Sequence, residues 1–282
     1  MDMKPHIAPV SDDRRPPRAA PAPGRRPAIF ITGAASGIGR ACAELFAARG
    51  WFVGLYDLNA EGVADIAATL GEGNATSGAL DVCYPDAWQR ALAHFWQHGG
   101  QRLDVLLNNA GVLTAGPFET VALARHHAML DVNVASVVAG CHSAYSYLRL
   151  TPGARVINMA SATAIYGQPE LVTYSATKFA VRGFTEGLDL EWSKVGIRVS
   201  AIWPSFVNTA MAAGFTGVAS AKSLGIRLTP ADVAATVWRC ATTRRLIHKT
   251  HWTVGLQAGL LSLGTRIAPA PLTRWIVGKL AR

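Results

Sequence analysis

Short runs of apolar and β-branched residues alternate with longer stretches of helical periodicity from residue 28 onward. Strands are expected at 28–32, 51–57, 76–80, 105–108, 155–159, 198–202 and near Trp252. Helices are expected at 38–49, 60–70, 86–98, 120–150, 174–194 and 230–242. Continuous apolar strands separated by helices are typical of a parallel sheet that is covered on both faces. The pattern therefore predicts an α/β fold with a single doubly wound domain and a central parallel sheet of about seven strands.

The two ends of the chain break this alternation. Residues 1–27 contain seven prolines and five arginines without apolar periodicity, which is typical of a disordered segment. We therefore expect a disordered leader at 1–27, one domain at 28–255, and a basic, apolar C-terminal extension at 256–282.

Positive charge is concentrated at these ends. The chain carries a net charge of +9, and all eight basic residues after Asp232 lie in a stretch without any acidic residue. The leader contributes a surplus of three positive charges, so residues 28–232 are slightly acidic. Because a protein that binds nucleic acid presents a positive field on its folded surface, no nucleic-acid partner is expected.

Cysteine and histidine spacing gives no sign of a metal site. Cys42, Cys83, Cys141 and Cys240 lie far apart, and the eight histidines form no H-E-x-x-H pattern. No metal is expected, and such widely spaced cysteines make a reducing compartment the default. Since the leader also lacks the apolar core of a secretory signal, the predicted location is the cytoplasm.

One uncharged stretch, residues 199–221, is long enough to cross a membrane by length alone. Pro204, Asn208, three serines and two glycines interrupt it. A buried strand that runs into a mobile loop is therefore the better interpretation.

A glycine-rich turn follows the first strand and precedes a helix. Residues 32–40 read T-G-A-A-S-G-I-G-R. Glycine allows a tight turn, close approach of a pyrophosphate and close packing of helix on strand, while the helix start offers free N–H groups to phosphate. An ordinary loop is the alternative, but the position between strand and helix favours a Rossmann-like dinucleotide site. The expected cofactor contacts are Gly33, Ser36, Gly37, Ile38 and Gly39.

Asp57 ends the second strand, 18 residues after Gly39, with Leu58 next to it. At this position a carboxylate accepts hydrogen bonds from the ribose hydroxyls of the adenosine and repels a 2′-phosphate. No basic residue within the turn or directly after Asp57 offsets that repulsion, so NAD(H) is favoured over NADP(H). The alternative is that Asp57 only ends a strand.

A phenol and an ammonium group share one helix face further along the chain. Tyr174 and Lys178 are four residues apart, the spacing that brings side chains together on a helix. Ser161 follows the strand at 155–159, at the carboxyl edge where open parallel sheets bind ligands.

With these residues in place, residues 28–255 resemble the short-chain dehydrogenase/reductase family. The family's T-G-x-x-x-G-x-G turn is similar to Thr32–Gly39, and its adenine-binding acid and hydrophobe match Asp81 and Val82. Its N-N-A-G element matches 108–111, so the resemblance adds Asn109, Ala110 and Gly111 to the cofactor contacts. The family's active-site residues match Asn133, Ser161, Tyr174 and Lys178.

One segment departs from the family pattern. After the sixth strand Pro204 is followed by Ser205 where the family usually has glycine, while Val207 and Thr209 fit the positions near the nicotinamide carboxamide. Ser205 could narrow the substrate entrance, offer a hydroxyl to a bound carbonyl, or be simple loop variation.

The resemblance implies a role for each chemical residue. Tyr174 would be the general base in alcohol oxidation and the acid in ketone reduction, with Lys178 lowering its pKa and binding the nicotinamide ribose. Ser161 would donate to the substrate oxygen, and Asn133 would hold a water that links Lys178 to solvent. Taken singly, each residue also fits a structural role, as a cap, a helix-bending side chain or a surface charge.

The implied function is reversible hydride transfer between NAD(H) and a small-molecule secondary alcohol or ketone. The residues expected to face the substrate are mostly apolar, which favours an apolar or aromatic alcohol: Ser161, Ala162, Ile165, Tyr166, Leu171, Ser205, Phe206, Met211 and Phe215. Two alternatives are an NADPH-dependent carbonyl reductase and a non-catalytic dinucleotide-binding scaffold. Retention of every chemical residue argues against the scaffold.

The C-terminal residues 272–282 predict a basic amphipathic helix. Docking on a neighbouring subunit or over the active site is the first interpretation, and weak contact with an anionic membrane surface is the second. The resemblance also implies a homodimer or homotetramer formed through residues 132–148 and the helix that carries Tyr174.

Overall fold

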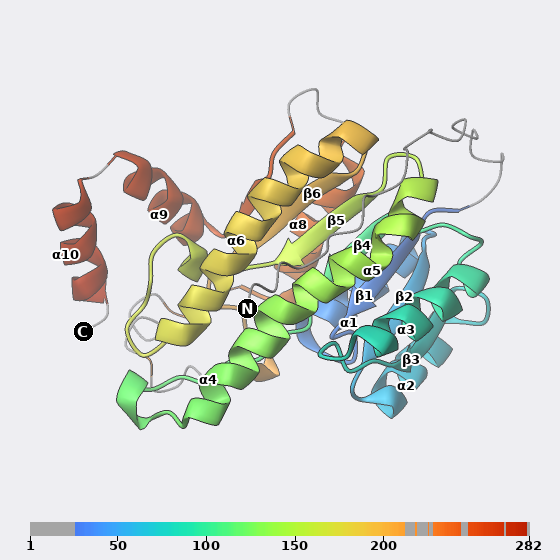
Figure 1. Cartoon of the computed structure of the whole chain (residues 1–282), viewed down its shortest axis with the longest axis horizontal. Coiled ribbons are helices and arrows are strands. Elements are labelled where there is room, and N and C mark those ends of the chain that lie inside the picture. Colours follow the sequence, from blue (N-terminus) through green and yellow to red (C-terminus); the bar gives the residue numbers. More distant parts are fainter. Residues whose placement is uncertain are drawn as a thin grey trace, which may run out of the picture.

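A seven-stranded parallel sheet forms the centre of the computed structural model (Figure 1), in the order β3-β2-β1-β4-β5-β6-β7. The structure describes residues 26–211, 218, 225, 228–243, 248–267 and 269–280. The strands are β1 (Ala28–Thr32), β2 (Phe52–Asp57), β3 (Ala75–Ala79), β4 (Val105–Asn108), β5 (Arg155–Met159), β6 (Arg198–Pro204) and β7 (His251–Val254). The doubly wound fold predicted from the sequence is confirmed.

Helices cover both faces of the sheet, because alternate strand residues point to opposite sides. The helices are α1 (Gly37–Ala48), α2 (Ala60–Leu70), α3 (Pro85–His98), α4 (Leu123–Leu130), α5 (Ser136–Leu150), α6 (Val172–Trp192), α8 (Pro230–Thr242), α9 (Leu256–Ile267) and α10 (Ala270–Leu280). Phe30 faces a core shared with α3, α5 and α6, whereas Ile29 and Ile31 face a core shared with α1, α2 and α8. Short 3-10 turns occur at Phe118–Thr120, Ala162–Ala164 and Ser193–Val195.

The single helix expected at 120–150 is divided in the structure. A π-helical turn, Asp131–Ala135, joins α4 to α5. A π turn inserts one residue into the helical ladder and redirects the side chains within it, often at functional sites. Here it turns Asn133 inward, where the side chain is buried.

The strand order places the site. β1 lies between β2 and β4, so the chain leaves β1 toward one edge of the sheet and later returns to build the other. In such folds the connections on either side of this reversal diverge and leave a crevice at the carboxyl ends of the strands. The glycine turn after β1 and Asn109 after β4 both lie at this crevice.

Some expectations fall outside the described residues. Residues 1–25 of the predicted leader, Phe215, and most of the loop expected after β6 belong to this group. In the part of the chain that the structure describes, no helix is long and apolar enough to span a bilayer. All four cysteines are free, and only Cys83 is exposed.

Candidate active site

The glycine turn after β1 forms a cradle that only glycine permits at two of its positions. Gly33 has φ +66°, in the left-handed region that favours glycine. A Cβ on Gly39 would lie 2.1 Å from the carbonyl oxygen of Gly33, so α1 packs directly against the turn. The N-terminus of α1, which begins at Gly37, therefore faces the crevice with its free N–H groups, as phosphate binding requires.

The end of β4 holds this turn in place. The Asn109 side-chain amide donates to the carbonyl oxygens of Thr32 at 2.9 Å and Gly33 at 3.1 Å. In return, Thr32 Oγ1 accepts from the backbone N–H groups of Asn109 and Ala110, both at 3.0 Å. These four bonds join the two sides of the crevice and hold the turn in its observed conformation.

Two carboxylates lie further along the same crevice. Asp57 accepts from the backbone N–H groups of Ala35 and Asn59, each at 3.0 Å. Asp81 accepts from the backbone N–H of Cys83 at 3.0 Å. Asp57 is thus oriented by backbone groups on both sides, and it still lines the cavity.

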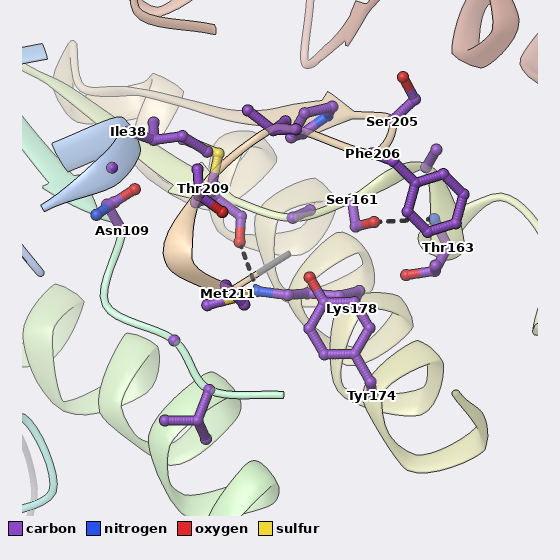
Figure 2. A pocket seen from close by; sticks show the side chains of 18 of the residues that line it. Ile38, Asn109, Ser161, Thr163, Tyr174, Lys178, Ser205, Phe206, Thr209 and Met211 are labelled. Carbon is purple, nitrogen blue, oxygen red and sulfur yellow. Dashed lines mark hydrogen bonds between the residues drawn. The ribbon is translucent and has the colours of Figure 1, made fainter. Parts of the chain in front are cut away.

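Three chemical side chains meet at the carboxyl end of β5. Ser161 follows β5 directly, and its Oγ accepts from the backbone N–H of Thr163 at 3.2 Å. Lys178 Nζ donates to the carbonyl oxygen of Met159 at 2.9 Å and lies 5.4 Å from the centre of the Tyr174 ring. Figure 2 shows Ser161, Tyr174 and Lys178 converging on one space. β5 and the first turns of α6 therefore bring together residues that are 17 positions apart in sequence.

Burial governs the protonation of these groups. It raises the pKa of Tyr174 to about 12, against which a hydrogen bond with Ser161 acts. It also lowers the pKa of Lys178 to about 8. Desolvation is thus the largest influence on the pKa of Tyr174, and the expectation that Lys178 favours the phenolate stays a prediction.

Asn133 has a different set of partners from those expected. Its side-chain oxygen accepts from the N–H of Val112 at 2.8 Å, and its amide donates to the carbonyl of Val112 at 2.9 Å and to Thr177 Oγ1 at 3.2 Å. The side chain therefore pins the loop after β4 to the helix that carries Tyr174. Its role in proton exchange stays a prediction.

A cavity of about 680 Å³ runs along this crevice. Most of the cofactor contacts expected from the sequence line it: Gly33, Ser36, Gly37, Ile38, Asp57, Leu58, Asp81, Val82, Asn109, Ala110, Gly111, Tyr174, Lys178, Pro204, Val207 and Thr209. Gly39 lies behind the turn, where the helix packs on it. Five residues expected at the substrate also line the cavity: Ser161, Ala162, Ser205, Phe206 and Met211.

Three other residues expected at the substrate do not line this cavity, so their contact with a substrate stays a prediction. Ile165 is buried in the core formed with α5 and α6, because the 3-10 turn after Ser161 carries it away from the cavity. Leu171 is buried in a small apolar cluster with Met129 and Tyr174. Tyr166 is half-buried and does not line the cavity.

Ser205 lines the cavity but lies away from the chemical residues. In Figure 2 its hydroxyl points away from Tyr174 and Lys178. A Cβ on Gly255 would lie 3.3 Å from Ser205 Oγ, so this hydroxyl is directed toward the turn after β7. This position disfavours a direct bond to a substrate carbonyl held by Ser161.

One wall of the cavity contains residues that the sequence analysis did not name, although docking of residues 272–282 over the active site was part of its first interpretation. Gln168, from the loop before α6, and Thr163 contribute polar groups, and both terminal helices contribute residues: Gln257, Ala258, Leu260, Leu261, Gly264, Thr265, Thr273 and Val277. The helical apolar spacing in 256–267 was a signal for α9, although it could not show which face turns inward. The C-terminal extension therefore shares the cavity with the preceding domain.

Comparison with known proteins agrees with this geometry. A sequence model of the short chain dehydrogenase family matches residues 27–217. The chain is 36% identical over 184 residues to D-threitol dehydrogenase of Mycolicibacterium smegmatis, covering 64% of this chain and 70% of that protein. It is 33% identical over 212 residues to meso-2,3-butanediol dehydrogenase of Serratia marcescens, covering 73% and 84%.

A third sequence relative and one solved structure are also similar to this chain. A 3-alpha-(or 20-beta)-hydroxysteroid dehydrogenase of Mycobacterium bovis is 35% identical over 183 residues, covering 64% of this chain and 69% of that protein. The crystal structure of a 3-ketoacyl-(acyl-carrier-protein) reductase from Brucella melitensis complexed with NADH has a TM-score of 0.75 at 26% identity, covering 81% of this chain and 96% of that one. The chain therefore belongs to the short chain dehydrogenase family, whose members are oxidoreductases that use a nicotinamide dinucleotide.

Proposed function

We propose that the protein transfers a hydride reversibly between NAD(H) and a secondary alcohol or ketone of apolar or aromatic character. The observation that carries this proposal is the convergence of Ser161, Tyr174 and Lys178 in the cavity that the glycine turn opens. A phosphate-binding cradle beside a proton donor and an oxygen-binding hydroxyl is the arrangement that such a reaction needs.

Each side chain has a defined task in this reaction. Ser161 Oγ donates a hydrogen bond to the substrate oxygen, and Tyr174 Oη takes the alcohol proton in oxidation or returns it in reduction. The bound nicotinamide supplies the hydride acceptor or donor. Lys178, held by the carbonyl of Met159, favours the phenolate by its charge. Because burial raises the pKa of Tyr174, its phenol carries a proton at pH 7 and can donate it in ketone reduction. Oxidation requires the phenolate, so the rate of oxidation should rise with pH.

Asp57 supports NAD(H) as the cofactor. Its carboxylate lines the cavity and is oriented by Ala35 and Asn59, where it would face the ribose hydroxyls and repel a 2′-phosphate.

Replacing Asp57 with serine is expected to shift the ratio of kcat/KM for NADH over NADPH toward NADPH by about tenfold or more, because removing a like charge removes a repulsion of over 1.4 kcal/mol. The hydroxyl retains an acceptor for Ala35, so folding is preserved. Steady-state rates with both cofactors measure the shift. A wild-type protein that prefers NADPH would contradict the NAD(H) assignment and favour the carbonyl-reductase alternative.

The substrate class is supported by the apolar residues around the chemical groups. Phe206, Met211, Leu260 and Leu261 line the cavity. Absorbance of the reduced nicotinamide should report turnover when the protein is screened with apolar secondary alcohols, aromatic alcohols, steroids and polyols. Activity confined to polyols would overturn the apolar assignment, and cofactor binding without any turnover would favour the scaffold alternative.

The assembly and location follow as parts of the same proposal. A homodimer or homotetramer through α5 and α6 is supported by exposed apolar side chains on these helices, among them Val138, Val172 and Phe179. Light scattering of the purified protein measures its mass, and a monomer would refute this assembly. We propose a cytoplasmic protein whose C-terminal helices make weak contact with a membrane surface.

A further inference from the structure

Helix α9 presents two different faces. Residues at helical spacing on one face line the cavity: Gln257, Ala258, Leu261, Gly264 and Thr265. Leu256, Leu260 and Leu263, four and three residues apart, form the other face and are 58% to 78% exposed. Side chains at this spacing form one continuous stripe. The cavity-lining face packs toward the rest of the protein, as one face of a surface helix normally does. The stripe of exposed leucines has no such partner among the described residues.

Helix α10 repeats this division. Thr273 and Val277, one helical turn apart, are buried and line the cavity. On its outer side Leu272 is 46% exposed and Trp275 57% exposed. Figure 1 shows α9 and α10 projecting beyond the sheet at the end of the chain, away from α1, α2 and α3. The two helices together form an arm, residues 256–280, that is closed toward the cavity and apolar toward the outside.

Charge distinguishes between the partners that this arm could meet. Arg274 and Lys279 are exposed on α10, and no acidic residue occurs after Asp232. Lys279 Nζ lies 4.3 Å from the centre of the Trp275 ring. A symmetric contact between two copies of the arm would bring these cations together without any carboxylate in the arm to offset them. An anionic bilayer accepts both the cations and the apolar stripe.

We propose that the arm docks on an anionic membrane surface, and that the cavity it closes receives a lipophilic secondary alcohol or ketone from that membrane. The docking is interfacial, because neither α9 nor α10 is long enough to cross a bilayer. The arm lies flat, with leucines and Trp275 among the acyl chains and Arg274 and Lys279 at the phosphates.

The substrate part of the proposal depends on Leu260. This residue lines the cavity and is also 60% exposed, so it stands at an opening of the cavity on the apolar face of the arm. A molecule dissolved in the bilayer therefore reaches Phe206 and Tyr174 without crossing water. This part rests on the proposed oxidoreductase function, whereas docking does not.

Vesicle co-sedimentation of the full-length protein tests docking. The test variant is Leu272→Gln with Arg274→Gln on α10, and the matched control is Leu123→Gln with Arg125→Gln, an exposed pair at the same spacing on α4. With phosphatidylcholine–phosphatidylserine vesicles we expect wild type and control to bind alike, and the test variant to bind at least about tenfold more weakly. Equal binding by all three proteins, or no binding by wild type, overturns docking.

Two further measurements keep the outcomes separate. Thermal unfolding verifies that the test variant is folded, and light scattering reports its mass. A change in mass without a change in vesicle binding would show that the arm contacts a second copy instead, which overturns the proposal.

Delivery of substrate is tested by turnover with vesicles present. The test variant should oxidise water-soluble isopropanol as wild type does, and should lose about tenfold in rate on testosterone or other steroid and long-chain alcohols that partition into the vesicles. Equal loss on both classes, or no turnover of any lipophilic alcohol, overturns the substrate part. Failure to oxidise any alcohol refutes the proposed function, and the vesicle assay then still decides docking.

Discussion

Replacing Tyr174 with phenylalanine should lower kcat by about 10³-fold, the range over which a positioned proton donor accelerates a reaction. The phenol meets Ser161 and lies beside Lys178 at the end of β5, and the remaining ring still fills its place against Met129 and Leu171. Cofactor affinity should change by less than about threefold, because the glycine turn and Asp57 are untouched. Steady-state kinetics and fluorescence titration with NADH measure the two effects.

The matched control is Tyr166→Phe, since Tyr166 follows the 3-10 turn Ala162–Ala164 but does not line the cavity. It should retain the wild-type rate.

A pH profile of the reaction rate gives a second test of Tyr174. Because burial raises the pKa of Tyr174, the phenolate fraction and the oxidation rate of the wild type should rise with pH above neutrality, and the Phe variant should lack this rise. A Tyr174→Phe protein that binds NADH and keeps full turnover would refute the mechanism.

Replacing Lys178 with methionine should abolish most turnover and yet stabilise the folded protein. The unfolded lysine has a pKa near 10.5, whereas burial lowers the pKa of the folded one to about 8. At pH 7 this difference costs about 3 kcal/mol, and loss of the charge-assisted hydrogen bond to the carbonyl of Met159 offsets about 2 kcal/mol of that gain. The variant should therefore be about 1 kcal/mol more stable than wild type.

The pH dependence of the free energy of unfolding distinguishes removal of a buried charge from improved packing as the cause of the stabilisation. Between pH 8 and 10.5 the unfolded state binds the lysine proton and the folded state does not, so wild-type stability rises with pH relative to the variant. Urea unfolding at both ends of this interval should show the stability difference shrinking toward zero or below. Lys194→Met, at an exposed site, is the control and should stay within about 0.5 kcal/mol of wild type. A less stable Lys178→Met protein at pH 7 would contradict the argument.

Local pattern was enough to predict the sheet and the chemistry-bearing motifs. β1, β4 and β5 have the bounds that apolar runs predicted, because strands buried on both faces must be continuously apolar. The glycine turn lies between strand and helix as expected, since the close approach of α1 to Gly33 leaves no room for a Cβ. Tyr174 and Lys178 share a helix face for the same local reason, the helical repeat. In these cases the determining contacts lie within a few residues of each other.

Tertiary packing decided what no local pattern records. The direction of the Ile165 side chain depends on a 3-10 turn. Asn133 lies within a π-helical turn and bonds Val112, which is 21 residues away in the loop after β4. The protonation of Tyr174 and Lys178 depends on how completely the surrounding elements exclude water. The arm of α9 and α10 reaches a cavity whose glycine turn lies more than 200 residues earlier in the chain, so its inner and outer faces are defined only once the sheet is assembled. The sequence by itself therefore determined which groups can react, and the folded chain determined what surrounds them, because burial and long-range contact are properties of the whole packed chain.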